Sequence, residues 1–413
     1  MKTEKLVNVA GAVLICVLAG SVFAQDTAGP GEGRTSEFVA SRVYQSTGPV
    51  YALAGGEFDL AHDGMEIACL TSDGLMSTML QLSPNFLTWE VSLRYEGRTP
   101  INDMKARPMI GIGDVHSGYP GNEVVMFTRH PSVVTVVFND PNNGWSHDVV
   151  VDNIGWIGDG WGARAGDYDP YRPGDEILFI YESPMDFSTA AIFREIAGVW
   201  ESEYIYGVDE IGEVGMDSAA GDFDWDHTGP EIVIVTEMGP TYELTADQDP
   251  NKDDWPRRTI WDDEHNAGWV TKVADVDPWS PGDEIIYGTR YSNRIMMSRH
   301  NGDEPHEPQV LFTGNAGLVA ASSNMWDIAV GDVLLRSPGL EILGVDETGS
   351  VYLVQRIGET WQGEVIWQDS EPLYAVTVGD FLPQRSGDEI LVAGESGTIT
   401  ILIPGLRGIF PGN

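Results

Sequence analysis

The sequence predicts an all-β fold: a seven-bladed β-propeller with four antiparallel strands per blade. One short motif recurs seven times along the 413 residues, and each copy lies among short apolar segments typical of strands. No segment has the apolar periodicity of an amphipathic helix. Four short strands in each period of 48 to 57 residues is the pattern of a propeller blade.

The recurring motif joins two strands. Its clearest copy, at 166–177, reads Gly-Asp-Tyr-Asp-Pro-Tyr-Arg-Pro-Gly-Asp-Glu-Ile. An apolar strand ends in Gly-Asp, a polar loop follows, and Gly-x-Glu opens the next apolar strand. The acidic residues that open the seven loops are Glu57, Asp114, Asp167, Asp222, Asp275, Asp332 and Asp380.

The other strands of each repeat follow the same order. In the sixth repeat, strand-like segments cover 327–332, 341–345, 350–355 and 361–367. The seventh repeat has no fourth strand after 398–403, whereas residues 38–45 at the other end of the chain resemble the missing one. We therefore expect the N-terminal strand to complete the last blade and to close the ring, which removes free sheet edges.

The motif also resembles a known repeat. Gly-Asp-Phe/Val-Asp followed by Gly-x-Glu-Ile and an apolar strand is similar to the FG-GAP/VCBS repeats of integrin α-subunit propellers and of many exported bacterial proteins, over about residues 38–404. The resemblance implies the fold. It implies no single function, because that repeat occurs in adhesins, lyases, dehydratases and scaffolds.

The first residues predict export. Lys2 and Lys5 precede an apolar run at 6–18, and Val-Phe-Ala precedes Gln25, so 1–24 reads as a signal peptide. The run is too short to span a bilayer. We expect a disordered leader at 25–36, the propeller at 37–405 and a tail at 406–413, in a periplasmic or extracellular protein. Cys69 then remains the single cysteine and is expected in the core.

Charge limits the choice of partner. The chain has 64 Asp and Glu against 23 Lys and Arg, a formal net charge of −41. Such a charge argues against nucleic acid or an anionic membrane as a partner. It suits solubility in salt, cation binding, or both.

The turn is also a candidate metal site. In the resembled repeats such loops often bind calcium, and here only repeats three to five keep two early aspartates, since His116, Leu334 and Leu382 replace the second acid in repeats two, six and seven. Hard oxygen ligands suit Ca²⁺. The candidate ligands are Asp167, Asp169, Glu176, Asp222, Asp224, Asp226, Glu231, Asp275, Asp277 and Glu284. The alternative is that the acids accept backbone N–H bonds within the turn.

Residues at the ends of the first strands that lie away from the turns indicate a ligand site. Five of the seven residues that lie five positions before the turn glycine are aromatic, and charged residues interrupt small ones nearby. We expect these residues to meet around the mouth of the central channel. The candidate ligand-binding residues are Trp161, Arg164, Asp217, Trp269, Lys272, Trp326, Asp327, Tyr374, Arg129, His130, Arg290 and His265.

Aromatic planes stack on sugars, and arginine pairs with carboxylates, so the mouth suits an acidic sugar. We expect non-catalytic binding of a carbohydrate or an extracellular protein. One alternative is a polysaccharide lyase or sugar dehydratase, with Lys272, His265 or His130 as base and Arg164 holding a uronate carboxylate. Another is a purely structural scaffold, in which the aromatics only pack. The sequence contains no zinc-ligand spacing, phosphate-binding loop or nucleophile elbow.

Overall fold

The computed structural model describes most of residues 38–405. Within that span it leaves out 60–63, 73–74, 84–87, 97–108, 130–131, 153–159, 183–187, 208–213, 225, 228, 238, 247–254, 263–266, 301–307, 315–324, 335–336 and 338. The predicted signal peptide, leader and tail lie outside the described residues. Within those residues every regular element is a β-strand, so none is a helix long enough to cross a membrane.

The strands form seven four-stranded antiparallel sheets among the described residues. Sheets one to three contain β2 (Val50–Gly56), β3 (Glu66–Thr71), β4 (Leu75–Ser83), β5 (Thr88–Glu96); β6 (Met109–Gly113), β7 (Glu123–Thr128), β8 (Val133–Asp140), β9 (Gly144–Asp152); and β10 (Gly160–Gly166), β11 (Glu176–Glu182), β12 (Ser188–Ile196), β13 (Val199–Gly207). Sheets four to six contain β14 (Gly215–Gly221), β15 (Glu231–Thr236), β16 (Pro240–Thr245), β17 (Arg257–Asp262); β18 (Gly268–Ala274), β19 (Glu284–Thr289), β20 (Arg294–Ser298), β21 (Gln309–Thr313); and β22 (Met325–Gly331), β23 (Glu341–Asp346), β24 (Ser350–Ile357), β25 (Thr360–Gln368).

Sheet seven contains strands from both ends of the described chain. Its order is β1 (Phe38–Gln45), β28 (Thr398–Pro404), β27 (Glu389–Gly394) and β26 (Leu373–Gly379). β1 pairs antiparallel with β28, from Phe38 opposite Pro404 to Gln45 opposite Thr398. The predicted pairing of the N-terminal strand with the last repeat is confirmed, as is the β-propeller with four antiparallel strands per blade.

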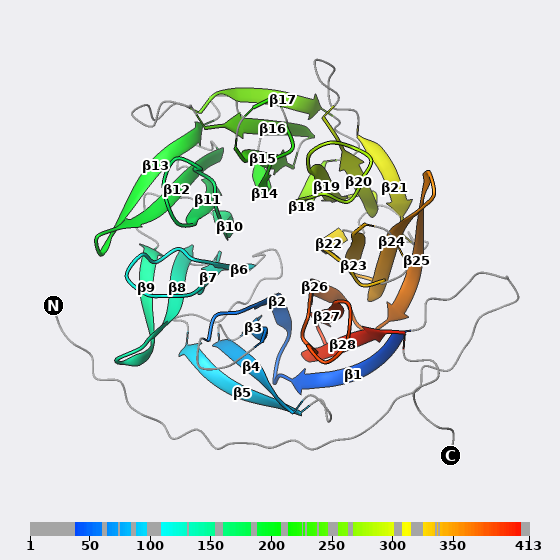
Figure 1. The fold of residues 1–413 in the computed structure, drawn as a ribbon, viewed down its shortest axis with the longest axis horizontal. Coiled ribbons are helices and arrows are strands. Elements are labelled where there is room, and N and C mark those ends of the chain that lie inside the picture. Colours follow the sequence, from blue (N-terminus) through cyan, green and yellow to red (C-terminus); the bar gives the residue numbers. More distant parts are fainter. Residues whose placement is uncertain are drawn as a thin grey trace, which may run out of the picture.

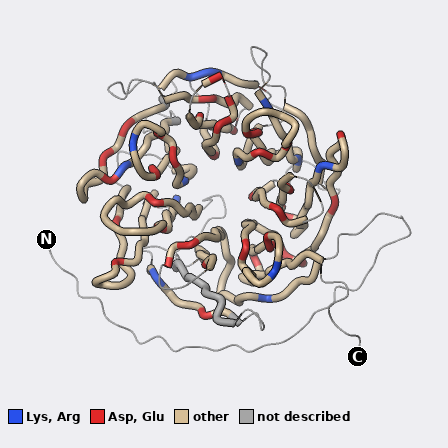
Figure 2. Tube along the Cα trace, viewed as in Figure 1, with Lys and Arg blue, Asp and Glu red and all other residues tan. Residues whose placement is uncertain are grey.

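The sheets are arranged around a central opening, and the innermost strands are β2, β6, β10, β14, β18, β22 and β26 (Figure 1). Each innermost strand contacts the innermost strand of the next sheet, and β26 contacts β2. The second strands, such as β3, β15 and β27, are buried along their whole length, which explains their continuous apolar sequence. Figure 2 shows Asp and Glu distributed around the whole ring.

The hydrophobic core lies between neighbouring sheets. Val125 and Phe127 of sheet two pack with Ile177 and Phe179 of sheet three in one buried cluster. Gly160 shows how tightly the sheets meet, because a Cβ there would lie 2.6 Å from the Phe127 ring and 2.9 Å from the Phe179 ring. Cys69 is fully buried in the cluster between sheets seven and one, as predicted.

Polar contacts between sheets recur at the turn end. In the turns of sheets two, three, five and seven, the residue between Gly and Glu reaches back to the turn of the preceding sheet. Asp175, Asp283 and Asp388 each accept the backbone N–H of an opening acid, at 2.9, 3.1 and 3.0 Å for Asp114, Asp222 and Asp332. Asn122 instead donates to the Glu57 carbonyl at 2.9 Å. We call these contacts the turn latches.

Candidate functional site

The closing glutamate organises the turn. In sheet three, Glu176 Oε2 accepts the backbone N–H groups of Tyr168 and Asp169, at 2.9 and 3.1 Å. The same pair of bonds forms at Glu66, Glu123, Glu231, Glu284 and Glu341, and Glu389 accepts the N–H of Leu382. This arrangement needs no metal, because a buried carboxylate satisfies the two donors of the loop.

The acids that open the loops are arranged differently from what the sequence predicts. All seven opening side chains are exposed, including the candidate ligands Asp167, Asp222 and Asp275. The acid that closes the loop, and not the one that opens it, accepts the loop's N–H groups. A carboxylate at the opening position therefore belongs to the surface, while the closing glutamate belongs to the interior.

The second acids of sheets three and five face arginine. Asp169 Oδ2 lies 3.1 Å from Arg194, which also bonds Glu176 at 3.4 Å. Asp277 pairs with Arg299 of its own sheet at 3.2 Å and with Arg356 of sheet six. In these two sheets guanidinium groups supply the positive charge that the calcium prediction assigned to a metal.

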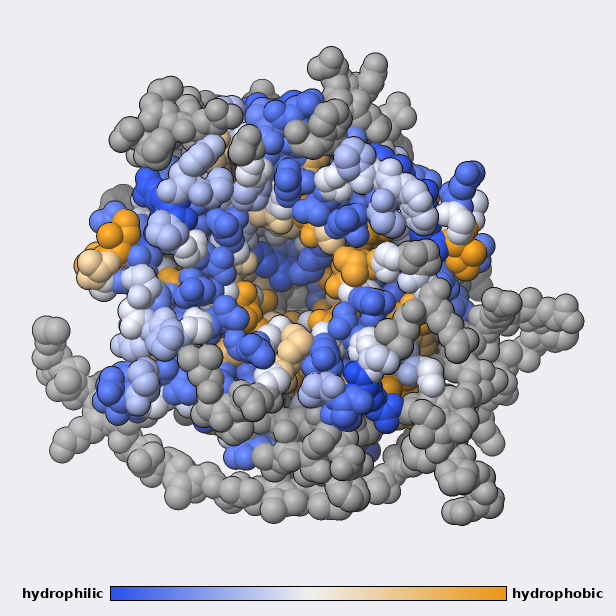
Figure 3. Space-filling view, viewed as in Figure 1, coloured by the Kyte–Doolittle hydropathy of each residue, from blue (hydrophilic) through white to orange (hydrophobic). Residues whose placement is uncertain are grey.

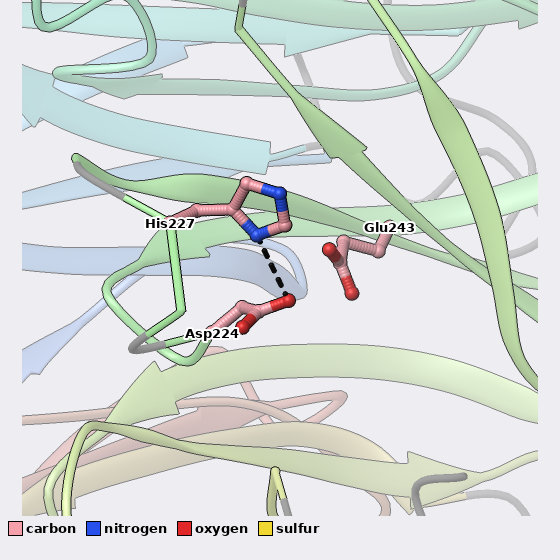
Figure 4. A group of neighbouring side chains, drawn as sticks. All are labelled: Asp224, His227 and Glu243. Atoms are coloured by element: carbon pink, nitrogen blue, oxygen red, sulfur yellow. Dashed lines mark ion pairs between the residues drawn. The ribbon is translucent and has the colours of Figure 1, made fainter. Parts of the chain in front are cut away.

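Sheet four differs from its neighbours. Asp224 is buried in the turn and lies between His227, Glu243 and Arg258, with His227 and Glu243 both turned toward it (Figure 4). His227 Nδ1 is 3.1 Å from Asp224 Oδ2. Arg258 donates to Asp224 Oδ2 at 2.9 Å and to Glu243 Oε2 at 2.6 Å.

The second oxygen of Asp224 faces sheet five. His300 Nδ1 lies 3.4 Å from Asp224 Oδ1, and His300 Nε2 lies 3.3 Å from Asp226 Oδ2. Two sets of ligand-type atoms therefore share Asp224: Asp224, His227 and Glu243 form one, and Asp224, Asp226 and His300 form the other. In each set all the atoms lie within 4.8 Å of one another.

Burial and charge act in opposite directions on these carboxylates. Burial alone would raise the pKa of Asp224, but the Asp226 N–H, the interactions with His300 and His227, and the charge of Arg258 lower it overall. Burial raises the pKa of Glu243 despite the bond from Arg258. Burial, together with the charges of Glu243 and Asp222, raises the pKa of Glu231 to about 8.

The predicted aromatic residues meet at the opposite end of the inner strands. Their ring centroids form a continuous arc: Trp269 to Trp326 is 5.7 Å, Trp326 to Tyr374 is 5.6 Å, and Tyr374 to Tyr51 is 5.6 Å. Trp269 and Tyr374 are 4 % and 7 % exposed, so they mainly support the arc. Trp326 and Tyr51 are half-buried and present more surface. Trp161 packs against the same buried cluster as Trp269 and Trp326, and its ring lies against Arg129.

The loops after the second strands place charged groups against these rings. The Arg129 guanidinium lies 3.6 Å from the Trp161 ring, and Arg290 lies 4.8 Å from both Trp269 and Tyr291. Arg290 is also paired with Glu237. The Tyr374 hydroxyl donates to Glu395 at 2.9 Å. The loops between the second and third strands, which carry Arg129, Arg290 and Glu395, therefore lie next to the aromatic residues of the inner strands.

The charged residues of the inner strands are largely paired within the ring. Arg164 forms a 3.1 Å ion pair with Asp217, which is fully buried and also accepts the Thr271 N–H at 3.0 Å. Asp327 Oδ2 accepts the Val376 N–H of sheet seven at 3.1 Å. Burial would lower the pKa of Arg164, but Asp217 raises it overall. Lys272 is half-buried on β18.

Two predicted residues, His130 and His265, lie outside the described residues. Figure 3 shows the centre of the ring as a hollow, with hydrophilic residues on part of its wall. The mouth arc and the sheet-four cluster occupy opposite ends of the inner strands. A seven-residue strand is about 20 Å long, so the two groups are separate sites.

Comparison with known proteins supports the fold. No family model matches the chain, and no curated protein matches its sequence. Among solved structures, the crystal structure of BBS1N in complex with ARL6DN, soaked with lead, matches with a TM-score of 0.55 at 10 % identity, over 91 % of this chain and 98 % of that chain. The mercury-soaked crystal gives 0.53 at 9 % identity, over 90 % and 97 %. These likenesses show a β-propeller fold.

Sequence reasoning missed His227, Glu243, Arg258 and His300. Glu243 gave no signal, because strand alternation puts it with Thr241 and Thr245 on the polar face, whereas both faces of this part of β16 are buried. The others sit in loops or outer strands of variable spacing, so no motif connects them.

Proposed function

We propose that this protein is a non-catalytic binding module whose ligand docks at the channel mouth. The observation that carries the proposal is the continuous arc of Trp269, Trp326, Tyr374 and Tyr51. Aromatic contacts hold these rings in place before any ligand arrives, and a preorganised aromatic surface loses little conformational entropy on binding.

The favoured ligand is an acidic carbohydrate chain. In a protein with a net charge of −41, Arg129 and Arg290 both lie against aromatic rings at this end of the strands. Aromatic faces suit the apolar faces of sugar rings, and arginine suits carboxylate or sulfate groups. Tyr291 is 49 % exposed beside Arg290 and extends the surface outward.

Pairing in the channel supports binding over catalysis. The alternative enzyme, a lyase or sugar dehydratase, required Arg164 to hold a substrate carboxylate. Arg164 instead holds Asp217, and Asp217 holds the backbone of sheet five. A substrate would have to break a buried ion pair before binding, which is costly.

A protein ligand is the second candidate. The BBS1N structure that shares this fold is in complex with ARL6DN. A propeller surface is therefore able to serve as a docking platform for another protein, and an aromatic mouth is compatible with that role. The scaffold alternative differs from both candidates in requiring no ligand at the mouth.

A screen of the purified protein against a glycan array tests the proposal. Uronate-containing or sulfated glycans should bind, and Trp326→Ala and Tyr291→Ala should each weaken binding by about tenfold or more, as expected for lost stacking. Trp279→Ala is the matched control, since Trp279 is exposed at the turn end. The carbohydrate ligand is rejected if both mouth variants still bind glycans. It is also rejected if no glycan binds and a protein is captured through the mouth.

We further propose that the seven sheets are the blades of one closed FG-GAP/VCBS-type ring in an exported protein. Support comes from the turn motif in each repeat and from the contact between β26 and β2. Calcium at the turns of sheets three to five also remains a proposal. Its test is the melting temperature with calcium and after chelation, since a ligand of the native state raises it. Identical melting curves would reject calcium binding.

A further inference from the structure

We propose that the sheet-four cluster of Asp224, His227 and Glu243 binds one divalent transition-metal ion of the Zn²⁺ class. The proposal is independent of the mouth. It shares Asp224 with the calcium prediction for the turn of sheet four, but differs from that prediction because it uses an imidazole and a residue of β16. The site lies at the turn end of sheet four, where Figure 4 shows the three side chains converging.

The geometry suits such an ion. The three ligand-type atoms lie within 4.8 Å of one another, and His227 Nδ1 is 3.1 Å from Asp224 Oδ2. With zinc–ligand bonds of about 2.0–2.2 Å, neighbouring donor atoms in a tetrahedron are about 3.4 Å apart. Small side-chain rotations therefore bring the three donors onto one ion. Histidine nitrogen and carboxylate oxygen are both donors that zinc accepts.

Sheets three and five provide an internal comparison. The position three residues after the second acid is Arg172 in sheet three and Ser280 in sheet five, but His227 in sheet four. The strand residue opposite the closing glutamate is Arg194 in sheet three, whereas Thr245 lies opposite Glu231. Sheet four has thus replaced a buried arginine with a neutral residue.

Contacts from the next sheet show the same replacement. Asp277 of sheet five receives Arg356 from sheet six, whereas Asp224 of sheet four receives His300 from sheet five. His300, itself a possible metal ligand, thus stands where sheet five has a guanidinium. At the position of Arg194 sheet four has Thr245, and its own arginine, Arg258, reaches Asp224 from β17. His300 and Asp226 form the second set around Asp224 and are placed to hold the outer side of the site.

The cluster contains more buried negative charge than its cation balances. Asp224, Glu231 and Glu243 are at most 2 % exposed, and Arg258 is the guanidinium that bonds two of them. Within the described part of the chain, Glu231 Oε1 is buried and accepts no hydrogen bond, as is also true of Glu284 Oε1 and Glu341 Oε1 in sheets five and six. Buried carboxylates require a counter-charge or a proton, and a divalent ion supplies the counter-charge.

Arg258 makes the proposal sharply testable. One of its nitrogens bonds both Asp224 Oδ2 and Glu243 Oε2, so it stands where the ion would sit. Its side chain is 47 % exposed, so it is able to turn into solvent when an ion enters. Removing it should therefore strengthen metal binding, whereas a purely structural cluster would only lose stability.

Isothermal titration of the tag-free, chelator-treated protein with ZnCl₂ is the primary experiment. We expect one site, weakened at least tenfold by Asp224→Asn and by His227→Gln and strengthened about tenfold by Arg258→Ala. His147→Ala, an exposed histidine of β9, is the matched control and should bind as wild type. His227 is itself 44 % exposed, so His227→Gln should fold even where Asp224→Asn does not.

Cobalt(II) provides a second readout. Its visible absorption should change on binding to the wild type and should not change with His227→Gln, because the spectrum reports the donor set. The proposal is overturned if zinc produces no saturable heat, if Arg258→Ala does not bind more tightly, or if His227→Gln and His147→Ala behave alike. Binding of CaCl₂ but not ZnCl₂ would overturn it in favour of calcium.

Discussion

At the scale of single residues, Asp217 links three elements of the ring. It lies on β14, forms an ion pair with Arg164 of β10, and accepts a backbone bond from Thr271 of β18. Asp327 makes the corresponding backbone bond to Val376 of β26. Both aspartates thus join the inner strands of neighbouring sheets, which accounts for acidic residues among small ones in a crowded channel.

Asp217→Ala tests this structural role. The change leaves the Arg164 guanidinium and the Thr271 N–H without their acceptor in a buried site, and we expect a loss of about 3–5 kcal/mol in the free energy of unfolding. Urea denaturation measures the loss. The double variant Arg164→Ala with Asp217→Ala should recover part of it, because no unpaired charge remains. A loss below about 1 kcal/mol would show that the pair does not hold the ring together.

At the scale of elements, the turn end of each sheet is held to its neighbour. The turn latches join sheets two and three, four and five, and six and seven through Asp175, Asp283 and Asp388. A second contact between sheets starts at the end of the third strand of a sheet. Its residue directly follows the residue that lies opposite the closing glutamate. It joins Asn139 to Asp59 at 3.0 Å and His300 to Asp224 at 3.4 Å. Each turn is therefore both the end of a strand pair and part of an interface.

Asp388→Ala tests a single latch. It removes the acceptor of the Asp332 N–H at 3.0 Å, while the Asp388 N–H still donates to the Asp332 carbonyl at 2.9 Å. We expect a loss of about 1 kcal/mol in unfolding free energy, the usual net value of one hydrogen bond. Asp380→Ala, at an exposed opening acid of the same sheet, should change it by less than about 0.5 kcal/mol. Equal losses in the two variants would contradict the latch.

Local patterns in the sequence predict this fold well because strands and turns are specified locally. Apolar runs and the Gly-Asp…Gly-x-Glu spacing place β26 and β27 in sheet seven, and a looser copy of the motif places β2 and β3 in sheet one. The alignment of the inner strands likewise predicted the aromatic arc. Partners across sheets were not predictable. The hairpin between β12 and β13 differs in length from that between β16 and β17, so Arg194 and Arg258 occupy different positions relative to their turns.

At the scale of the whole molecule, repetition gives the protein many buried glutamates in one kind of site. Burial raises the pKa of Glu123 to about 8 and those of Glu341 and Glu389 to about 7, although each accepts backbone N–H bonds. These three belong to repeats without a second acidic residue, so no candidate metal loop complicates their titration. When the pH rises above these values, the ionised glutamates of several repeats add to the repulsion within an acidic ring.

Stability should therefore fall as the pH rises through neutrality. The folded pKa of these glutamates exceeds the value of about 4.5 in the unfolded chain, so the folded state binds protons more tightly. Their contribution is fully present below pH 4.5 and is lost as the pH rises to between about 7 and 8. We expect the free energy of unfolding to be at least about 1 kcal/mol lower at pH 8.5 than at pH 5.5, measured by urea denaturation.

Salt and substitution separate this effect from general repulsion. Added salt screens exposed charges much more than buried ones, so the pH dependence of the wild type should persist at 0.5 M NaCl, where the Debye length is about 4–5 Å. Glu341→Gln keeps an oxygen acceptor for Val333 and Leu334 but carries no titrating proton, so its stability should depend less on pH. A pH dependence that vanishes in salt, or that is unchanged in Glu341→Gln, would assign the effect to surface charge and not to the buried turns.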